Sequence, residues 1–351
     1  MRHTTPKSPR VLFVRIGAIG NALVSVPAIR AVRKSWPGAY LCLAGDPLTL
    51  ELMKSCPYLD ETISYDNKGP QKAGPGYARF VLELRKRRFT HVVHFRRYLR
   101  SELMGFLSGA PFRVGFATEA RLQLINQKVE YREGDNIIEL NLELVRALGI
   151  DACDRSLECW PPEQSEALDR LLGSVSGRGP LVVLHPVGAT QKQQLWPGFA
   201  ELAEMLEDNL DARLVMIGAP SERFLVEETA KATRSAVTAV GLSLDHVALL
   251  IKKADLFCGI DSGPAHLADA VQTPGAIIYA PHRGLGRQLR KWKPEGDDYL
   301  AFTPETDCQD CTKESCGPED KKRCAASIPV EDVYKGLAEL YEKKKETGGK
   351  S

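Results

Sequence analysis

Buried strands that alternate with helices occupy both halves of this chain, and this alternation restricts the folds open to it. Six apolar runs have the length of buried strands, and each is followed by a helical pattern: 11–15, 40–44, 90–95, 181–184, 213–217 and 254–258. Successive strand–helix units of this kind build parallel sheets covered by helices. The sequence therefore predicts two α/β domains, each with a parallel sheet.

The segment between the two sets of units is rich in turn-forming residues. It contains Pro161 and Pro162, a short predicted helix, and a Gly/Ser-rich stretch that ends at Pro180. A chain of 351 residues also exceeds the usual size of a single hydrophobic core. We therefore predict an N-terminal domain at 1–165, a C-terminal domain at 166–328, and a terminal helix with its tail at 329–351.

Composition and charge exclude several classes of protein. The chain is 43% hydrophobic and 26% charged, as ordinary globular proteins are. A net charge of +2 creates no basic field for binding nucleic acid. The first ten residues are polar and basic, and Arg15 interrupts the apolar run after them, so neither a signal peptide nor a membrane span is predicted. We expect a cytoplasmic monomer with at most peripheral membrane contact.

Four of the nine cysteines cluster near the C-terminus, at Cys308, Cys311, Cys316 and Cys324. In a reducing cytosol such a cluster favours a structural zinc site over disulfides. The spacing is looser than that of a zinc ribbon, because it contains one CxxC pair rather than two. Free thiols packed under a loop are therefore the other interpretation.

The stretch 259–270 is the first candidate binding site. Asp261, Ser262 and Gly263 join a buried strand to a predicted helix. A helix N-terminus presents backbone N–H groups and the positive end of the helix dipole, and both attract phosphate. The alternative is an ordinary strand–helix turn in which Asp261 and Ser262 only cap the helix.

A glycine turn follows the first predicted strand. Gly17 and Gly20 precede a helical pattern at 21–34, and their missing side chains let a ligand or another domain approach the backbone. The third glycine and the downstream acidic residue of a dinucleotide fingerprint are absent. The pattern therefore disfavours a Rossmann-type oxidoreductase.

Three arginines, Arg96, Arg97 and Arg100, directly follow the predicted strand 90–95. Ligands of open α/β sheets bind beyond the carboxyl ends of strands, and arginine binds anionic groups bidentately. These arginines are therefore candidates to hold an anionic substrate. Solvated surface charge explains them equally well on position alone.

Several of these segments resemble glycosyltransferase family 9, the bacterial lipopolysaccharide heptosyltransferases. The resemblance covers nearly the whole chain and rests on five segments together: 11–33, 100–116, 185–197, 261–268 and the cysteine-containing tail up to 332. It implies a GT-B fold, in which two facing Rossmann-like domains enclose the active site in a cleft. It also implies an inverting, metal-independent transfer of a sugar, usually heptose from ADP-heptose, onto a lipid A–core acceptor at the inner face of the inner membrane.

The resemblance further implies roles for individual residues. The predicted donor-binding residues are Thr190, Lys192, Gln194, Glu222, Leu242, Asp261, Ser262, Gly263 and His266. Ser262 and Gly263 would contact the diphosphate, whereas Asp261 would face sugar hydroxyls, because a carboxylate is repelled by a diphosphate. Glu222 would accept hydrogen bonds from the ribose, and Leu242 would pack on the adenine. The predicted acceptor-binding residues are Gly17, Gly20, Arg96, Arg97 and Arg100.

Two positions depart from the family pattern. Asn21 stands where the family usually has an aspartate that is thought to deprotonate the acceptor, and an amide takes no proton. Losing such a base typically costs about 10²–10⁴-fold in rate. Either another group replaces this base, with His94 or an Asp or Glu brought in as the domains close as candidates, or the acceptor needs little deprotonation early in the reaction. Gln194 stands where the family commonly has a phosphate-binding lysine, and we expect Lys192 to supply that charge instead.

The absence of the usual base leaves an alternative function open. A catalytically silent nucleotide-sugar-binding protein on the same fold would bind the donor without turnover, and it would gain activity in the variant Asn21→Asp. The changes from the family pattern are limited to the two positions above, and we therefore favour an enzyme.

Overall fold

The computed structural model describes residues 8–117, 124–188, 193–194, 196–279, 285–294, 298–304 and 324–348. The chain divides into two compact units, residues 1–160 and 161–351. None of the helices described in these ranges is long and apolar enough to cross a membrane.

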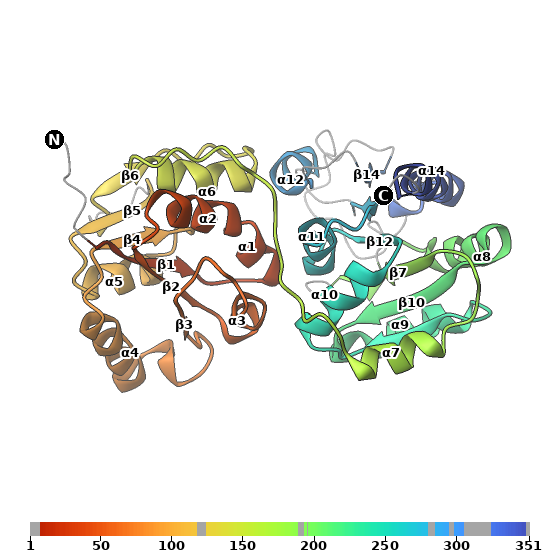
Figure 1. Cartoon of the computed structure of the whole chain (residues 1–351), viewed down its shortest axis with the longest axis horizontal. Coiled ribbons are helices and arrows are strands. Elements are labelled where there is room, and N and C mark those ends of the chain that lie inside the picture. The colour runs from red at the N-terminus through yellow and green to blue at the C-terminus, as the bar shows by residue number, and fades with distance from the viewer. Residues whose placement is uncertain are drawn as a thin grey trace. The chain divides into compact units, whose positions relative to one another are not determined.

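The first unit contains a parallel six-stranded sheet in the order β3-β2-β1-β4-β5-β6 (Figure 1). Its strands are β1 (Arg10–Arg15), β2 (Tyr40–Gly45), β3 (Glu61–Ser64), β4 (His91–His94), β5 (Phe112–Phe116) and β6 (Gln127–Val129). Its helices are α1 (Ile19–Leu23), α2 (Val26–Ser35), α3 (Pro47–Met53), α4 (Gly74–Lys86), α5 (Leu99–Leu107) and α6 (Ile137–Arg146), with a short 3-10 helix η1 (Pro70–Lys72). Helices α2 and α6 pack together on one face, and α4 and α5 lie on the other (Figure 1).

The helical pattern at 21–34 forms two helices, α1 and α2, rather than the single helix that it predicts. Pro27 lies in the first turn of α2, where proline is tolerated because that turn needs no N–H donor. The same ring would remove a hydrogen bond from the interior of one continuous helix and clash with the turn before it. The chain therefore breaks between Leu23 and Val26.

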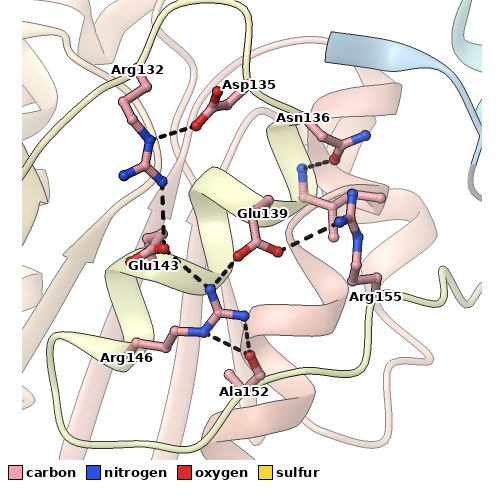
Figure 2. Close-up of polar contacts among 9 residues, drawn as sticks. Arg132, Asp135, Asn136, Glu139, Glu143, Arg146, Ala152 and Arg155 are labelled. Atoms are coloured by element: carbon pink, nitrogen blue, oxygen red, sulfur yellow. Dashed lines mark hydrogen bonds and ion pairs between the residues drawn. The ribbon is translucent and has the colours of Figure 1, made fainter. Parts of the chain in front are cut away.

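The last part of the first unit is held against α6 by arginine side chains. Arg146 donates hydrogen bonds to the carbonyl oxygen of Ala152 from Nε at 2.9 Å and from Nη2 at 2.6 Å, and it also pairs with Glu139 (Figure 2). Glu139 pairs in turn with Arg155 at 3.7 Å. Ion pairs this exposed contribute little stability individually, but together they fix the path of the segment.

A second anchor for the same segment comes from α2. The Arg30 side chain is fully buried and pairs with Asp154 at 2.8 Å and with Glu158 at 2.7 Å. The hydroxyl of Tyr58 also donates to Glu158, at 2.7 Å. The segment up to Glu158 is therefore a structural part of the first unit.

The second unit repeats the same architecture with the order β11-β10-β7-β12-β13-β14, again all parallel. Its strands are β7 (Leu181–His185), β10 (Arg213–Gly218), β11 (Val237–Val240), β12 (Leu256–Ile260), β13 (Gly275–Ile278) and β14 (Tyr299–Phe302), beside a short antiparallel pair, β8 (Val187–Gly188) and β9 (Gln193–Gln194). Its helices are α7 (Glu166–Gly173), α8 (Phe199–Leu210), η2 (Pro220–Glu222), α9 (Arg223–Lys231), α10 (Leu244–Lys253), α11 (Gly263–Ala270), α12 (Leu285–Trp292) and α14 (Val330–Gly348).

The C-terminal helix α14 belongs to the packing of the second unit. Its residues Val333, Leu337 and Leu340 lie in the core with Trp196 and residues of α8. Figure 1 shows α14 and α8 as neighbours, and the two helices are in contact. The two parallel sheets confirm the α/β prediction made from the strand–helix alternation.

Candidate active site

Each sheet has one point at which the strand order reverses, and several predicted site residues lie at these two points. In the first sheet the reversal lies between β1 and β4, which are followed by Gly17 and Arg96 respectively. In the second sheet it lies between β7 and β12, where His185 ends one strand and Ser262 follows the other. Open parallel sheets bind their ligands beyond the carboxyl ends of strands at such points.

In the first unit, Asn21 is held in place by the buried side chain of Arg15. The guanidinium donates from Nε to the Asn21 carbonyl at 2.6 Å, from Nη2 to Asn21 Oδ1 at 2.9 Å, and from Nη1 to the Phe95 carbonyl at 2.8 Å. Burial, with Arg96 nearby, lowers the pKa of Arg15 to about 9, so the guanidinium still carries its charge at neutral pH. Because Oδ1 already accepts from Arg15, the part of Asn21 available to a ligand is the donor Nδ2.

The three arginines after β4 differ in their surroundings. Arg96 is half-buried, donates to the Tyr98 hydroxyl at 2.7 Å and stacks over that ring. Arg97 is exposed and lies 3.9 Å from the centre of the Tyr131 ring, and Arg100 is exposed in the first turn of α5. Aromatic stacking of this kind holds a guanidinium in a fixed plane without neutralising it. Arg96 and Arg97 are therefore each held by an aromatic ring and keep their charge for an anionic ligand.

Gly17 is the point at which Arg96 and Asn21 meet. A side-chain Cβ at this position would lie 2.6 Å from Arg96 Nη1 and 3.1 Å from Asn21 Nδ2. Gly17 also has φ +143°, a conformation that residues with a side chain rarely adopt. The structure thus explains one predicted site glycine by both space and backbone conformation.

His94 is unsuited to the role of general base. Its side chain is fully buried, and burial together with Arg113 lowers its pKa to about 3. Neither ring nitrogen has a hydrogen-bond partner among the residues that the structure describes. A base needs contact with the acceptor hydroxyl and a pKa closer to the working pH, so the structure speaks against this candidate.

In the second unit a chain of polar contacts links two predicted donor-binding residues through His185. The Ser262 hydroxyl lies 3.1 Å from His185 Nδ1 and donates to the Ile260 carbonyl at 3.0 Å. On the other side of the ring, His185 Nε2 lies 3.8 Å from Glu222 Oε2. Ser262 occupies the N-cap position of α11, yet its hydroxyl makes no capping hydrogen bond.

Glu222 is a buried carboxylate with only part of its hydrogen-bonding capacity used. Its Oε2 accepts from the backbone N–H of Ala219 at 2.7 Å, whereas Oε1 is buried and has no partner among the described residues. Burial alone would raise the pKa of Glu222, but the contacts with His185 and the Ala219 N–H outweigh it and lower the pKa. A buried oxygen without a partner is costly, and a ligand hydroxyl would satisfy it.

The other predicted donor residues of the second unit differ in their exposure. Asp261 is exposed directly after β12, Gly263 begins α11, and Leu242 is half-buried in the turn after β11. His266 is buried, with its pKa lowered to about 4 by burial, and its ring packs against Trp292. His266 is therefore a neutral packing residue rather than a base.

Comparison with known proteins decides the family. The model of glycosyltransferase family 9 (heptosyltransferase) matches residues 77–322. The chain belongs to glycosyltransferase family 9. The lipopolysaccharide heptosyltransferase 3 of Escherichia coli is 26% identical over 299 residues, which cover 81% of this chain and 85% of that protein.

Solved structures of the family share the fold. A family 9 glycosyltransferase from Veillonella parvula DSM 2008 superposes with a TM-score of 0.81 at 18% identity, covering 95% of this chain and 97% of its own. The E. coli ADP-heptose lps heptosyltransferase II superposes with a TM-score of 0.77 at 19% identity, covering 96% of this chain and 99% of its own. These superpositions confirm the predicted GT-B fold class, and family membership confirms that the protein is a glycosyltransferase.

Some predicted residues of this family 9 protein fall outside the described part of the chain. These are Thr190, Lys192, Cys308, Cys311 and Cys316, whose assigned roles stay predictions. Gln194 lies in the short strand β9, paired with Val187. Cys324 is half-buried, and within the described ranges no group of three or more His, Cys, Asp or Glu side chains is arranged to hold a metal.

Two residues of the site received no role from the sequence. Arg15 was noted only as a charge that interrupts an apolar run, and His185 only as part of a segment that resembles the family. Each is the last residue of a central strand, at the carboxyl edge of its sheet. A polar residue that ends an apolar strand run is the signal that could have identified both.

Proposed function

We propose that the protein transfers heptose from ADP-heptose onto the core of lipopolysaccharide or a related anionic glycolipid. Inversion at the sugar carbon and independence from metal are part of the proposal and come from the family resemblance. The printed names of the two E. coli heptosyltransferases above support heptose as the sugar. The observation that carries the proposal is the contact chain Ser262–His185–Glu222 at the reversal point of the second sheet.

This contact chain offers complementary groups for a nucleoside diphosphate sugar. The Ser262 hydroxyl, held between His185 Nδ1 and the Ile260 carbonyl, would turn its proton from that carbonyl to a phosphate oxygen. The N-terminus of α11 adds the positive end of an eight-residue helix. At the other end, the buried and unpartnered Glu222 Oε1 would accept from a ribose hydroxyl. Asp261 would then face the sugar.

The first unit supplies groups for an anionic acceptor. Arg96, Arg97 and Arg100 carry positive charge beyond β4, and Asn21 presents an amide donor beside them. Guanidinium groups bind phosphate bidentately, so the phosphates of a glycolipid core are suitable ligands. A glycolipid acceptor also accounts for the expected peripheral contact with the membrane.

A thermal-shift panel of ADP-, UDP-, GDP- and CMP-linked sugars tests the proposal. We expect ADP-heptose to stabilise the protein, by about 2.7 kcal/mol at a concentration near 100 times Kd. Ser262→Ala should weaken binding by about 10–100-fold, the effect of losing a hydrogen bond to a charged group. Glu222→Gln should weaken it similarly.

Ser243→Ala is the matched control for this panel. Ser243 is also an N-cap serine in the second unit, and its hydroxyl likewise contacts a histidine, His246, at 3.1 Å. Its removal should leave the shift unchanged. Stabilisation by UDP- or GDP-sugars alone would overturn the ADP-heptose assignment, and an unchanged shift in Ser262→Ala would overturn the donor site.

A silent nucleotide-sugar-binding protein is the second candidate function, and Asn21 is the observation that favours it. The Asn21 amide is locked onto Arg15 and takes no proton. This alternative predicts donor binding without transfer, and a gain of transfer in Asn21→Asp.

A further inference from the structure

A carboxylate at the end of the neighbouring strand contacts the glycine turn that precedes Asn21. Asp46 directly follows β2, and the register pairs Gly45 of β2 with Arg15 of β1. Asp46 Oδ2 accepts a hydrogen bond from the backbone N–H of Gly17. The hydroxyl of Thr49 donates to the Gly17 carbonyl at 2.8 Å, so side chains that follow β2 hold both the N–H and the carbonyl of Gly17.

The orientation of Asp46 is not explained by helix capping. Asp46 occupies the N-cap position of α3, where an aspartate usually accepts from the N–H groups of the first turn. Its side chain makes no such bond and turns instead to Gly17. Arg96 and Asn21 approach the same glycine from other directions, since a Cβ there would lie 2.6 Å from Arg96 Nη1 and 3.1 Å from Asn21 Nδ2. One carboxylate, one amide donor and one guanidinium therefore meet at Gly17.

The charged surroundings of Asp46 suit a base rather than a permanent ion-pair partner. Burial raises the pKa of Asp46, while the Gly17 N–H and the charge of Lys68 lower it and Asp66 raises it. The net shift is upward, towards the working pH, which makes a carboxylate a better proton acceptor. The side chain is only partly buried, so a substrate hydroxyl can reach it.

From this arrangement we propose that Asp46 is the general base of the transfer. It would take over the role of the aspartate that the family usually has at the position of Asn21. The proposal rests on the proposed function. The acceptor hydroxyl gives its proton to the Asp46 carboxylate while its oxygen forms a bond to the anomeric carbon of the donor sugar. The bond from that carbon to the diphosphate oxygen breaks, and its electron pair leaves with the diphosphate. Asn21 Nδ2 orients the acceptor by donating a hydrogen bond.

The variant Asp46→Asn tests this assignment. Asparagine has nearly the same shape, and its amide oxygen still accepts from the Gly17 N–H, but it takes no proton. We expect kcat to fall by about 10²–10⁴-fold, with an unchanged thermal shift on ADP-heptose. In the wild type, kcat should fall as pH drops through the raised pKa of Asp46, because a protonated carboxyl group cannot accept the proton of the acceptor hydroxyl. This acid limb should be missing in the residual activity of Asp46→Asn, whereas a purely structural role would leave it in place.

Two further variants complete the experiment. Asp66→Asn removes a nearby negative charge from the loop after β3 and should keep kcat within about threefold of the wild type. Asp46→Glu restores a carboxylate and should recover part of the lost rate. Wild-type kcat in Asp46→Asn, or an acid limb that persists there, would overturn the assignment. Absence of any donor shift in the wild type would instead overturn the proposed function, and the role of Asp46 with it.

Discussion

Replacing Trp196 by alanine should lower the free energy of unfolding of the second unit by about 3–5 kcal/mol, the usual cost of emptying a large aromatic site in a core. The side chain is 1% exposed, packs edge-on against Phe199 with ring centres 5.0 Å apart, and donates from Nε1 to the Ile328 carbonyl at 3.2 Å. It thus joins the start of α8 to the segment that leads into α14. Urea unfolding followed by far-UV circular dichroism measures the effect.

Trp196→Phe separates the contribution of packing from that of the hydrogen bond. The smaller ring keeps most of the apolar contact and loses the donor to Ile328, so we expect a smaller loss than for alanine, with about 0.5–1.5 kcal/mol of it from the hydrogen bond. A loss below about 1 kcal/mol in Trp196→Ala would contradict the packing role given to this residue.

Replacing Arg15 by lysine should destabilise the first unit by about 2–4 kcal/mol and lower transfer as well. The guanidinium satisfies a buried acceptor on Phe95 and two partly buried acceptors on Asn21, and a lysine ammonium lacks the planar fork that reaches all three. Each acceptor left without a partner in the interior costs about 1–3 kcal/mol. Loss of the bond to Asn21 Oδ1 also frees the amide to rotate. Urea unfolding and kcat on the same sample measure the two effects.

Arg10→Lys is the matched control at the other end of β1. Arg10 donates to the Arg87 carbonyl at 2.6 Å and stacks 4.0 Å from the centre of the Tyr40 ring, but it is only half-buried. We expect a loss of about 1 kcal/mol or less, with kcat unchanged. Equal losses for Arg10→Lys and Arg15→Lys would contradict the special role of the buried guanidinium.

The sequence predicted the strands well because their apolar runs are long and bounded by glycine and proline. The alternation of strands and helices was sufficient to predict two parallel sheets, and Arg96 and Ser262 became candidate site residues because each follows such a run. The break in the pattern at 21–34 was missed because periodicity continues across Pro27, and only the proline ring indicates where two helices meet.

The parts of the site that the sequence did not predict depend on contacts between distant residues. Asp46 follows an apolar strand run just as Asp261 does, so its position could have marked it. The contact of Asp46 with Gly17, however, requires β2 to lie next to β1, and this pairing cannot be read from the sequence alone. His185 likewise can be recognised as a link between Glu222 and Ser262 only in the folded chain, where β7 lies next to β12.

The most direct test of the central claim is transfer itself, measured on the full chain with ADP-heptose and a lipopolysaccharide core acceptor that lacks a heptose. Release of ADP and the mass of the acceptor are followed together. We predict that ADP release is matched by the addition of one heptose per acceptor, and that Ser262→Ala and Asp46→Asn both reduce it. Donor binding without a heptose-bearing product would contradict the account and favour the silent binding protein.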